Sequence, residues 1–138
     1  MSIIAIDYGE KRVGLAISHE GILAKRYQTI KYKADDELLD KIAKICGEEE
    51  VEKIIIGLPV TLEEQKIGHQ AEEVNEFVER LKKDTKKPII LQDETLTSEE
   101  AKENLREENI SQDKIKMLID EEAARIILQD YLDRNENF

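Results

Sequence analysis

The amino end of this chain decides its fold, because residues 2–18 read SIIAIDYGEKRVGLAIS. The runs SIIAI and VGLAIS have the composition of buried strands, and a short glycine-containing segment between them predicts a tight turn. Asp7 directly follows the first of these runs and lies at the start of that turn. A carboxylate at the end of a buried strand is costly unless a positive charge lies beside it. Asp7 therefore predicts either a bound metal ion or an ion pair with the neighbouring Lys11 and Arg12.

The composition indicates one compact domain, residues 1–138, with a densely charged surface. Hydrophobic residues make up 40% of the chain and charged residues 38%, against about 25% charged residues in an average globular protein. The single cysteine excludes an internal disulfide. Because neither a signal segment nor an apolar run approaching ~20 residues is present, we expect a cytoplasmic protein without membrane contact.

The charge is unevenly distributed along the chain. The net charge is −11, yet residues 1–33 contain six basic and three acidic residues, so residues 34–138 carry −14. Phosphate contacts need a basic surface, which argues against strong non-specific binding of nucleic acid. A locally basic face on an acidic molecule instead favours a selective partner for structured nucleic acid.

The apolar periodicity predicts alternating strands and helices after the opening pair. The expected elements are a strand at 24–32, a helix at 35–46 that ends at Gly47, a strand at 53–57, a helix around 71–81, a strand at 88–92, a helix that opens at Thr97, and a long helix at 114–133. Charged residues alternate through 24–32, which is typical of a strand at the edge of a sheet.

This order predicts an α/β fold with a mixed five-stranded sheet, in which three antiparallel strands are followed by two parallel ones and helices flank both faces. The carboxyl ends of the first, fourth and fifth strands then lie together, where α/β folds place their sites. Those ends carry Asp7, residues 57–59 (Gly-Leu-Pro), and Asp93 with Glu94.

The last helix adds another acid to this site. Asp120 lies near the middle of the apolar arc of that helix, whereas Glu122 is expected on the opposite, polar side. Taken singly, Asp7 could pair with Lys11 or Arg12, Glu94 could be a loop acid, and Asp120 could be a helix-start residue. Together, three converging carboxylates are the ligand pattern for Mg²⁺ or Mn²⁺, and such ions activate water in phosphodiester cleavage.

The chain resembles the YqgF/RuvX family from Ser2 to Asp133. The resemblance rests on Asp7-Tyr8-Gly9, Lys11-Arg12, Gly14, Gly57-Leu58-Pro59, Asp93-Glu94-x-Leu96-Thr97, and the segment from Ile119-Asp120 to Tyr131-Leu132. It implies a ribonuclease H-like fold. It also implies either a Holliday junction resolvase or a nuclease that matures the end of pre-16S ribosomal RNA.

Carried over to this chain, the resemblance implies that Asp7, Glu94 and Asp120 form the catalytic and metal-binding site. It also implies that Lys11 and Arg12 contact the nucleic-acid backbone. Thr97 is expected mainly as the cap of the helix that begins there, and a cap hydroxyl beside a metal could also contact phosphate. Two departures weaken the expected substrate affinity. Thr95 stands where the family usually has an arginine, and the segment 61–65 contains two glutamates, Glu63 and Glu64, where the family usually has a glycine-containing loop.

We therefore expect a metal-dependent endonuclease that processes the 5′ end of pre-16S rRNA, with four-way junction DNA as a second substrate. Junction resolution would need a homodimer, whereas RNA processing is compatible with a monomer. Two other classes stay open. An Asp-x-Gly sequence also begins the phosphate-binding hairpin of actin-like and sugar kinases. The other class is a non-catalytic protein that binds RNA or the transcription machinery and retains the same fold.

Overall fold

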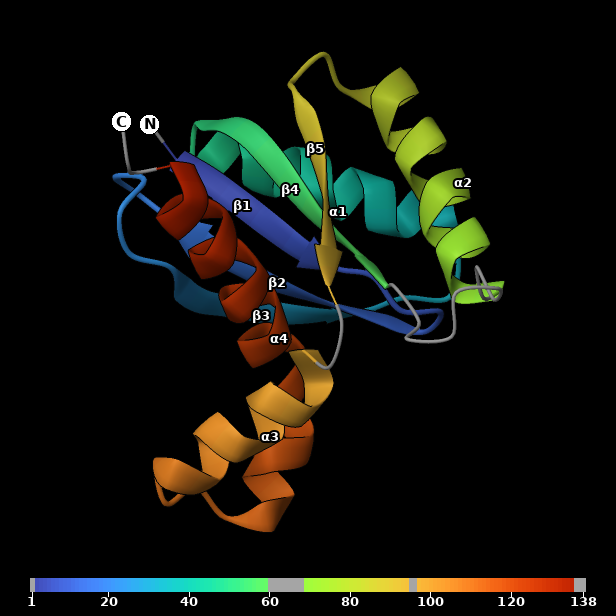
Figure 1. The fold of residues 1–138 in the computed structure, drawn as a ribbon. Coiled ribbons are helices and arrows are strands. Elements are labelled where there is room, and N and C mark those ends of the chain that lie inside the picture. Colours follow the sequence, from blue (N-terminus) through green and yellow to red (C-terminus); the bar gives the residue numbers. More distant parts are fainter. Residues whose placement is uncertain (1, 60–68, 95–96, 136–138) are drawn as a thin grey trace.

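The computed structural model describes residues 2–59, 69–94 and 97–135 (Figure 1). Its centre is a five-stranded sheet with the strand order β3-β2-β1-β4-β5. The strands are β1 (Ser2–Asp7), β2 (Arg12–Ser18), β3 (Lys25–Lys31), β4 (Val51–Pro59) and β5 (Ile89–Glu94). β1, β2 and β3 are antiparallel neighbours, and β4 and β5 continue parallel to β1. The predicted mixed sheet is confirmed, with β3 at its edge.

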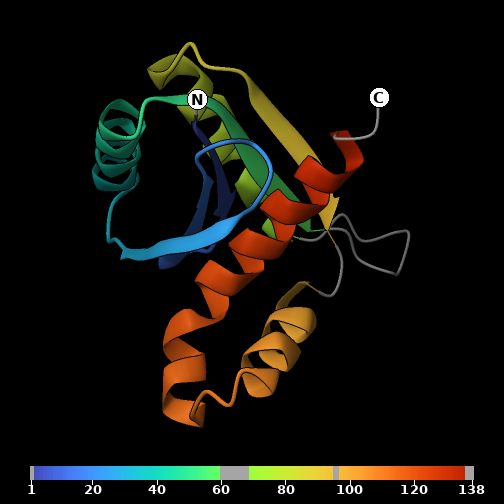
Figure 2. The same cartoon turned by 90° about the vertical axis from the view of Figure 1, so that its left-hand side faces the viewer.

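Helices cover both faces of this sheet (Figures 1 and 2). One face carries α1 (Asp35–Glu48) and α2 (His69–Asp84), and the other carries α4 (Gln112–Asn135), which crosses several strands. α3 (Thr97–Glu107) packs against α4, and the two form a hairpin that projects beyond the sheet. No helix in the described ranges has both the length and the apolar character needed to cross a bilayer.

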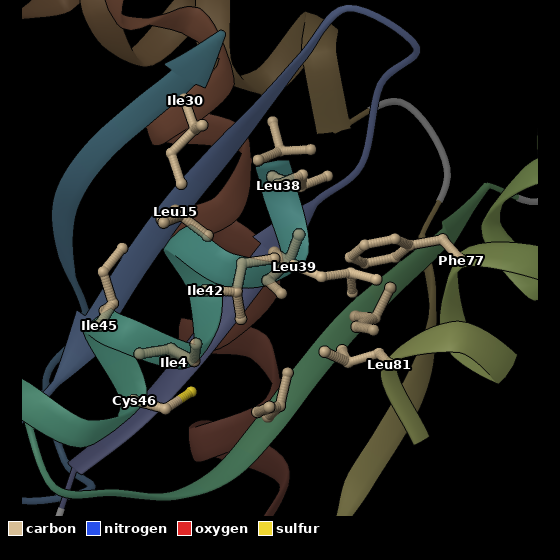
Figure 3. Packing of buried hydrophobic residues seen from close by; sticks show 14 of the residues in the cluster. Ile4, Leu15, Ile30, Leu38, Leu39, Ile42, Ile45, Cys46, Phe77 and Leu81 are labelled. Carbon is tan, nitrogen blue, oxygen red and sulfur yellow. The ribbon is translucent and has the colours of Figure 1, made fainter. Parts of the chain in front are cut away.

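Alternation along β1 divides the core between the two faces. Ile4 and Ile6 pack toward α1 and α2, in the cluster that Figure 3 shows with Phe77 and Leu81 of α2. Residues of the opposite parity pack under α4, and this second cluster includes Ile3, Ala5, Ala16, Ala124 and Ile127. Burial of these apolar side chains supplies most of the driving force for folding.

Two glycines allow α4 to lie directly on the sheet. A Cβ atom on Gly14 of β2 would overlap the backbone carbonyl of Asp120, and one on Gly57 of β4 would overlap the side chain of Ile127. Any other residue at position 14 would therefore push the helix away from β2. The distance between α4 and the sheet depends on the absence of these side chains.

The predicted end of α1 at Gly47 is wrong. The helix continues through Gly47 to Glu48, and the chain turns at Glu50, which has a positive φ of 52°. Gly47 is exposed, and the backbone bond from Glu49 N–H to the Ile45 carbonyl (2.9 Å) holds the last turn together. A glycine can thus lie inside a helix when its neighbours bury enough apolar surface.

The predicted exposure of Glu122 is also wrong, since its side chain is only 1% exposed. α4 is covered on two sides, by the sheet and by α3, and the contact with α3 buries Ala101, Ala123 and Ile126. The carboxylate of Glu122 is satisfied by four bonds: from Arg125 Nε (2.8 Å) and Nη2 (2.7 Å), from Asn104 Nδ2 (3.0 Å), and from Arg26 Nη1 (3.3 Å). It therefore joins β3, α3 and α4.

The surroundings of Glu122 determine its titration. Burial by itself raises the pKa of the Glu122 carboxyl, but the hydrogen bonds from Arg125 and Asn104 and the charge of Arg26 outweigh burial and leave the pKa below its usual value. The stabilisation from this cluster is present above the unfolded-state pKa of Glu122. It is lost as the pH falls through the folded-state pKa.

We expect Gly14→Ala to destabilise the fold by about 1–3 kcal/mol, because the new methyl group overpacks the contact with α4. Gly47→Ala is the matched control. Its Cβ meets nothing within 4 Å, so alanine should stabilise α1 by roughly 0.5–1 kcal/mol. Urea unfolding monitored by circular dichroism measures both variants. Equal stability of the two would contradict the close-contact interpretation.

We expect Glu122→Gln to lower the free energy of unfolding by about 3 kcal/mol, because it leaves Arg125 without its buried anion and leaves Arg26 with Glu108 alone. Glu103→Gln on the exposed side of α3 is the control, as its contact with Arg106 spans 3.8 Å between solvent-exposed side chains and should contribute only ~0–1 kcal/mol. Urea titrations at neutral and acidic pH should show the difference between Glu122→Gln and the native chain shrinking in acid. A difference that is independent of pH would argue against the charge of Glu122.

Candidate active site

Asp7 lies at the carboxyl end of β1, on the side of the sheet that α4 covers. Ile3 and Ala5, four and two positions earlier, pack in the cluster under α4. In the antiparallel pair of β1 with β2, Asp7 lies opposite Gly14. The contact of α4 with Gly14 therefore brings the helix to the strand position next to Asp7.

Asp120 is the residue of α4 at this contact, so the structure brings together two of the three predicted acids. Its backbone carbonyl lies against Gly14, and its side chain is 22% exposed. Asp7 is partly buried. Burial, followed by the negative charge of Asp120, raises the pKa of the Asp7 carboxyl to about 7. The neutral form is favoured because burial removes water from the ionised carboxylate and, to a lesser extent, because the nearby charge of Asp120 repels it.

Arg12 is the basic partner of this acid pair, and it binds Asp120 rather than Asp7. Its Nε lies 2.6 Å from Asp120 Oδ2, while its own side chain is 52% exposed. The sequence left open whether Lys11 or Arg12 would compensate Asp7. Lys11 is exposed, and its backbone carbonyl accepts a bond from Tyr32 N–H (3.1 Å). Arg12 thus neutralises one carboxylate and leaves the other with a raised pKa.

The turn between Asp7 and Arg12 is held by aromatic residues that sequence reasoning did not single out. Tyr8 stacks on Phe77 of α2 with ring centroids 4.6 Å apart. The Tyr32 hydroxyl donates to the Gly9 carbonyl at 2.5 Å. A tyrosine just beyond an edge strand is a weak signal, because the partner of its hydroxyl becomes evident only when β3 lies next to β2. These contacts fix the backbone that carries Lys11 and Arg12.

Glu94 is the last residue of β5, and the strand pairing places it opposite Pro59 of β4. Two positions earlier, the Gln92 amide donates to the Ile127 carbonyl of α4 at 2.9 Å, which fixes β5 against the helix. The side chain of Glu94 lies outside the described part of the structure. The same holds for the side chain of Thr97, the first residue of α3, and for the whole of Thr95, Glu63 and Glu64.

The donor chemistry of Asp7 and Asp120 fits a hard divalent cation. Both supply carboxylate oxygens, the ligands that Mg²⁺ and Mn²⁺ prefer. Their mutual repulsion would be relieved by a cation, which favours the ionised form of Asp7. Among the side chains that the structure describes, no group of three or more histidines, cysteines or acids could hold a metal ion. The described part of the site therefore consists of two carboxylates and Arg12.

Comparison with known proteins gives a consistent result. A family model described as RuvX, Holliday junction resolvase, matches residues 1–134. A protein of Clostridium novyi, provisionally named pre-16S rRNA nuclease, is 40% identical over 134 residues, covering 96% of this chain and 98% of its own. One of Thermoanaerobacter pseudethanolicus with the same name is 42% identical and covers 99% of both chains.

Solved structures with similar folds include Holliday junction resolvases. RuvC of T. thermophilus, solved with a Holliday junction substrate, aligns with a TM-score of 0.61 at 13% identity, over 99% of this chain and 97% of RuvC. Fowlpox virus resolvase with junction DNA aligns with a TM-score of 0.57 at 13% identity, over 97% and 98% of the two chains. At such low identity the likeness establishes the ribonuclease H-like fold. With the full-length match to the family model and to relatives at about 40% identity, the chain belongs to the RuvX family and is a nuclease of that fold.

Proposed function

We propose that this chain is a divalent-metal-dependent endonuclease that processes the 5′ end of pre-16S rRNA through Asp7, Asp120 and Glu94. The observation that carries the proposal is the position of Asp7 beside Asp120 at the carboxyl edge of the sheet, where burial and then the charge of Asp120 raise the pKa of the Asp7 carboxyl to about 7. Without a bound cation, holding two carboxylates that repel each other makes folding less favourable. A cation bound by both carboxylates would remove this repulsion.

In this proposal Asp7 and Asp120 hold Mg²⁺ or Mn²⁺, and Glu94 completes the ligand set. The ion would activate water and stabilise the leaving oxygen in phosphodiester cleavage. Glu94 is assigned from the sequence pattern and from its place at the end of β5, next to the end of β4.

Arg12 and Lys11 are proposed to bind the substrate backbone. Arg12 contacts Asp120 through Nε, and its side chain is 52% exposed. Arginine donors match the oxygens of a phosphate group well. A phosphate bound there would lie beside the acid pair, which is where the scissile bond has to be held. The Thr97 hydroxyl is assigned the same task from the sequence.

Pre-16S rRNA is the first proposed substrate because the relatives at about 40% identity carry that name. Four-way junction DNA is the second, because the family model bears the resolvase description. A junction resolvase must cut two strands, so this second activity requires a homodimer. A native mass measurement that gives a monomer at assay concentration would favour RNA processing.

The direct test is cleavage of labelled pre-16S 5′ precursor and labelled four-way junction in Mg²⁺ or Mn²⁺. We expect Asp7→Asn and Asp120→Asn each to lose about 100-fold or more in rate, since even indirect metal contacts are commonly worth 10–100-fold. Asp40→Asn, an exposed acid on α1, should cleave like the native chain. Persisting cleavage by Asp7→Asn would identify a contaminant. Binding that survives a chelator, without any cleavage by the native chain, would favour a non-catalytic RNA-binding protein.

The raised pKa of Asp7 predicts how stability depends on pH in metal-free buffer. The folded state keeps a proton on Asp7 up to about pH 7, whereas the unfolded chain releases it near pH 4. The stabilisation is complete below the unfolded-state pKa and is lost as the pH rises through the folded-state pKa. Asp7→Asn removes this loss, so its advantage in unfolding free energy should grow across this interval and then level off.

Divalent ions should reverse that advantage. Added Mg²⁺ or Mn²⁺ stabilises whichever chain binds it in the folded state, so the melting temperature of the native chain should rise more than that of Asp7→Asn. Asp40→Asn serves again as the control and should respond like the native chain. An equal response of all three chains to the ion would remove Asp7 from the metal site, whatever the cleavage assay shows.

A further inference from the structure

A groove of about 940 Å³ lies beside the edge strand β3, between α1 and the first half of α4. Its lining comes from all three elements and from the start of β2. Five of the lining side chains are basic: Arg12, Lys31, Lys41, Lys44 and Lys116. On a chain with a net charge of −11, such a concentration of positive charge in one concave surface calls for an explanation.

The three acids in the groove offset only part of the charge of its five basic residues. Asp120 is paired with Arg12, and Glu121 accepts a hydrogen bond from Thr29 at 3.1 Å. The third acid of the lining is Glu48. Two of the three are therefore already engaged, and neither of these contacts involves a lysine.

The four lysines of the groove are weakly paired. Lys41 has a 4.0 Å contact with Glu37 between two half-exposed side chains, which contributes little in water. Lys31, Lys44 and Lys116 form no ion pair with an acid in the described ranges. An ammonium group held at a concave surface without an anion attracts one from solution.

The lysines lie on both sides of β3 and lead toward the acid pair. Lys41 and Lys44 are three residues apart on α1, which puts them on one side of that helix. Lys116 is four residues, about one turn, before Asp120 on α4. Lys31, at the end of β3, is the register partner of Arg12 in β2. The basic surface thus begins at the proposed active site and extends away from it along the edge of the sheet.

We infer that this groove binds the phosphodiester backbone of the nucleic-acid substrate on one side of the cut. The inference rests on the proposed function and adds a substrate-binding surface formed by Lys31, Lys41, Lys44 and Lys116. Lysines act as point charges toward phosphate and read no base sequence. The groove therefore positions a strand for cleavage by its charge and shape. It also explains how an acidic protein can hold a polyanion.

The test compares two triple variants with the same loss of charge. The groove variant is Lys41→Gln/Lys44→Gln/Lys116→Gln. The control is Lys82→Gln/Lys83→Gln/Lys86→Gln, three exposed lysines at the end of α2 and just before β5, and thus at the opposite end of the sheet from Asp7. All six positions are exposed, so both variants should fold, as circular dichroism and melting curves can verify.

Fluorescence anisotropy of labelled pre-16S precursor and of labelled four-way junction is measured in chelator, so that the substrates stay intact. For the groove variant we expect affinity to fall about tenfold or more. The slope of log affinity against log salt should drop by roughly 0.7–0.9 for each phosphate that the variant no longer binds. A weaker affinity for both substrates supports binding of the shared backbone, and a weaker affinity for one identifies which nucleic acid the groove accepts.

Two results would overturn the inference: native-like binding by the groove variant, or an equal decrease in affinity in both triple variants, which would indicate a general effect of net charge. These results are separable from failure of the proposed function. If the native chain cleaves neither substrate but only the groove variant binds more weakly, the groove assignment stands and the nuclease proposal falls. If Asp120→Asn abolishes cleavage while the groove variant binds normally, the reverse holds.

Discussion

The contact between the α4 backbone and Gly14 sets the separation of helix and sheet on which the rest of the structure depends. It places Asp120 beside the strand position of Asp7. The same close approach continues at Gly57 and Ile127, where the Gln92 amide also bonds the helix. Because α4 lies this close to the sheet, its rotation about its own axis is fixed as well as its distance from the sheet. The side chain of Asp120 therefore points in one direction.

The carboxylates of Glu122 and Asp7 differ in how far neighbouring groups compensate their charge. Glu122 is surrounded by Arg125, Arg26 and Asn104 and is fully compensated. Burial and the nearby charge of Asp120 raise the pKa of the Asp7 carboxyl. A compensated buried charge joins elements together, whereas an uncompensated one remains available for a ligand. This contrast within one helix–sheet interface separates the structural cluster from the candidate site.

Much of the fold could be predicted because four of its five strands contain short apolar runs at clear intervals. The order of strands and helices is compatible with few sheet topologies. Parallel pairing of β1, β4 and β5 then places the ends of β4 and β5 at the same edge of the sheet as Asp7. Asp120 could be recognised because a carboxylate on an apolar helix face is anomalous.

The features that could not be predicted depend on contacts between distant segments. Glu122 has the pattern of a surface residue until α3 covers the second side of α4 and Arg26 reaches it from β3. The choice of Arg12 for Asp120 rather than Asp7 depends on the rotation of α4, which no local pattern encodes. The helical conformation of Gly47 depends on how firmly the preceding turns pack on the sheet.

The two edges of the sheet differ in a way that bears on self-association. β3 carries charged side chains at its two ends (Lys25, Arg26 and Lys31) and pairs with β2 through an irregular register, both of which hinder the addition of another strand. β5 is a short parallel strand whose Leu91 is 42% exposed. Partially unfolded molecules should therefore aggregate through the β5 edge, because the charges on β3 disfavour pairing of another strand at the opposite edge.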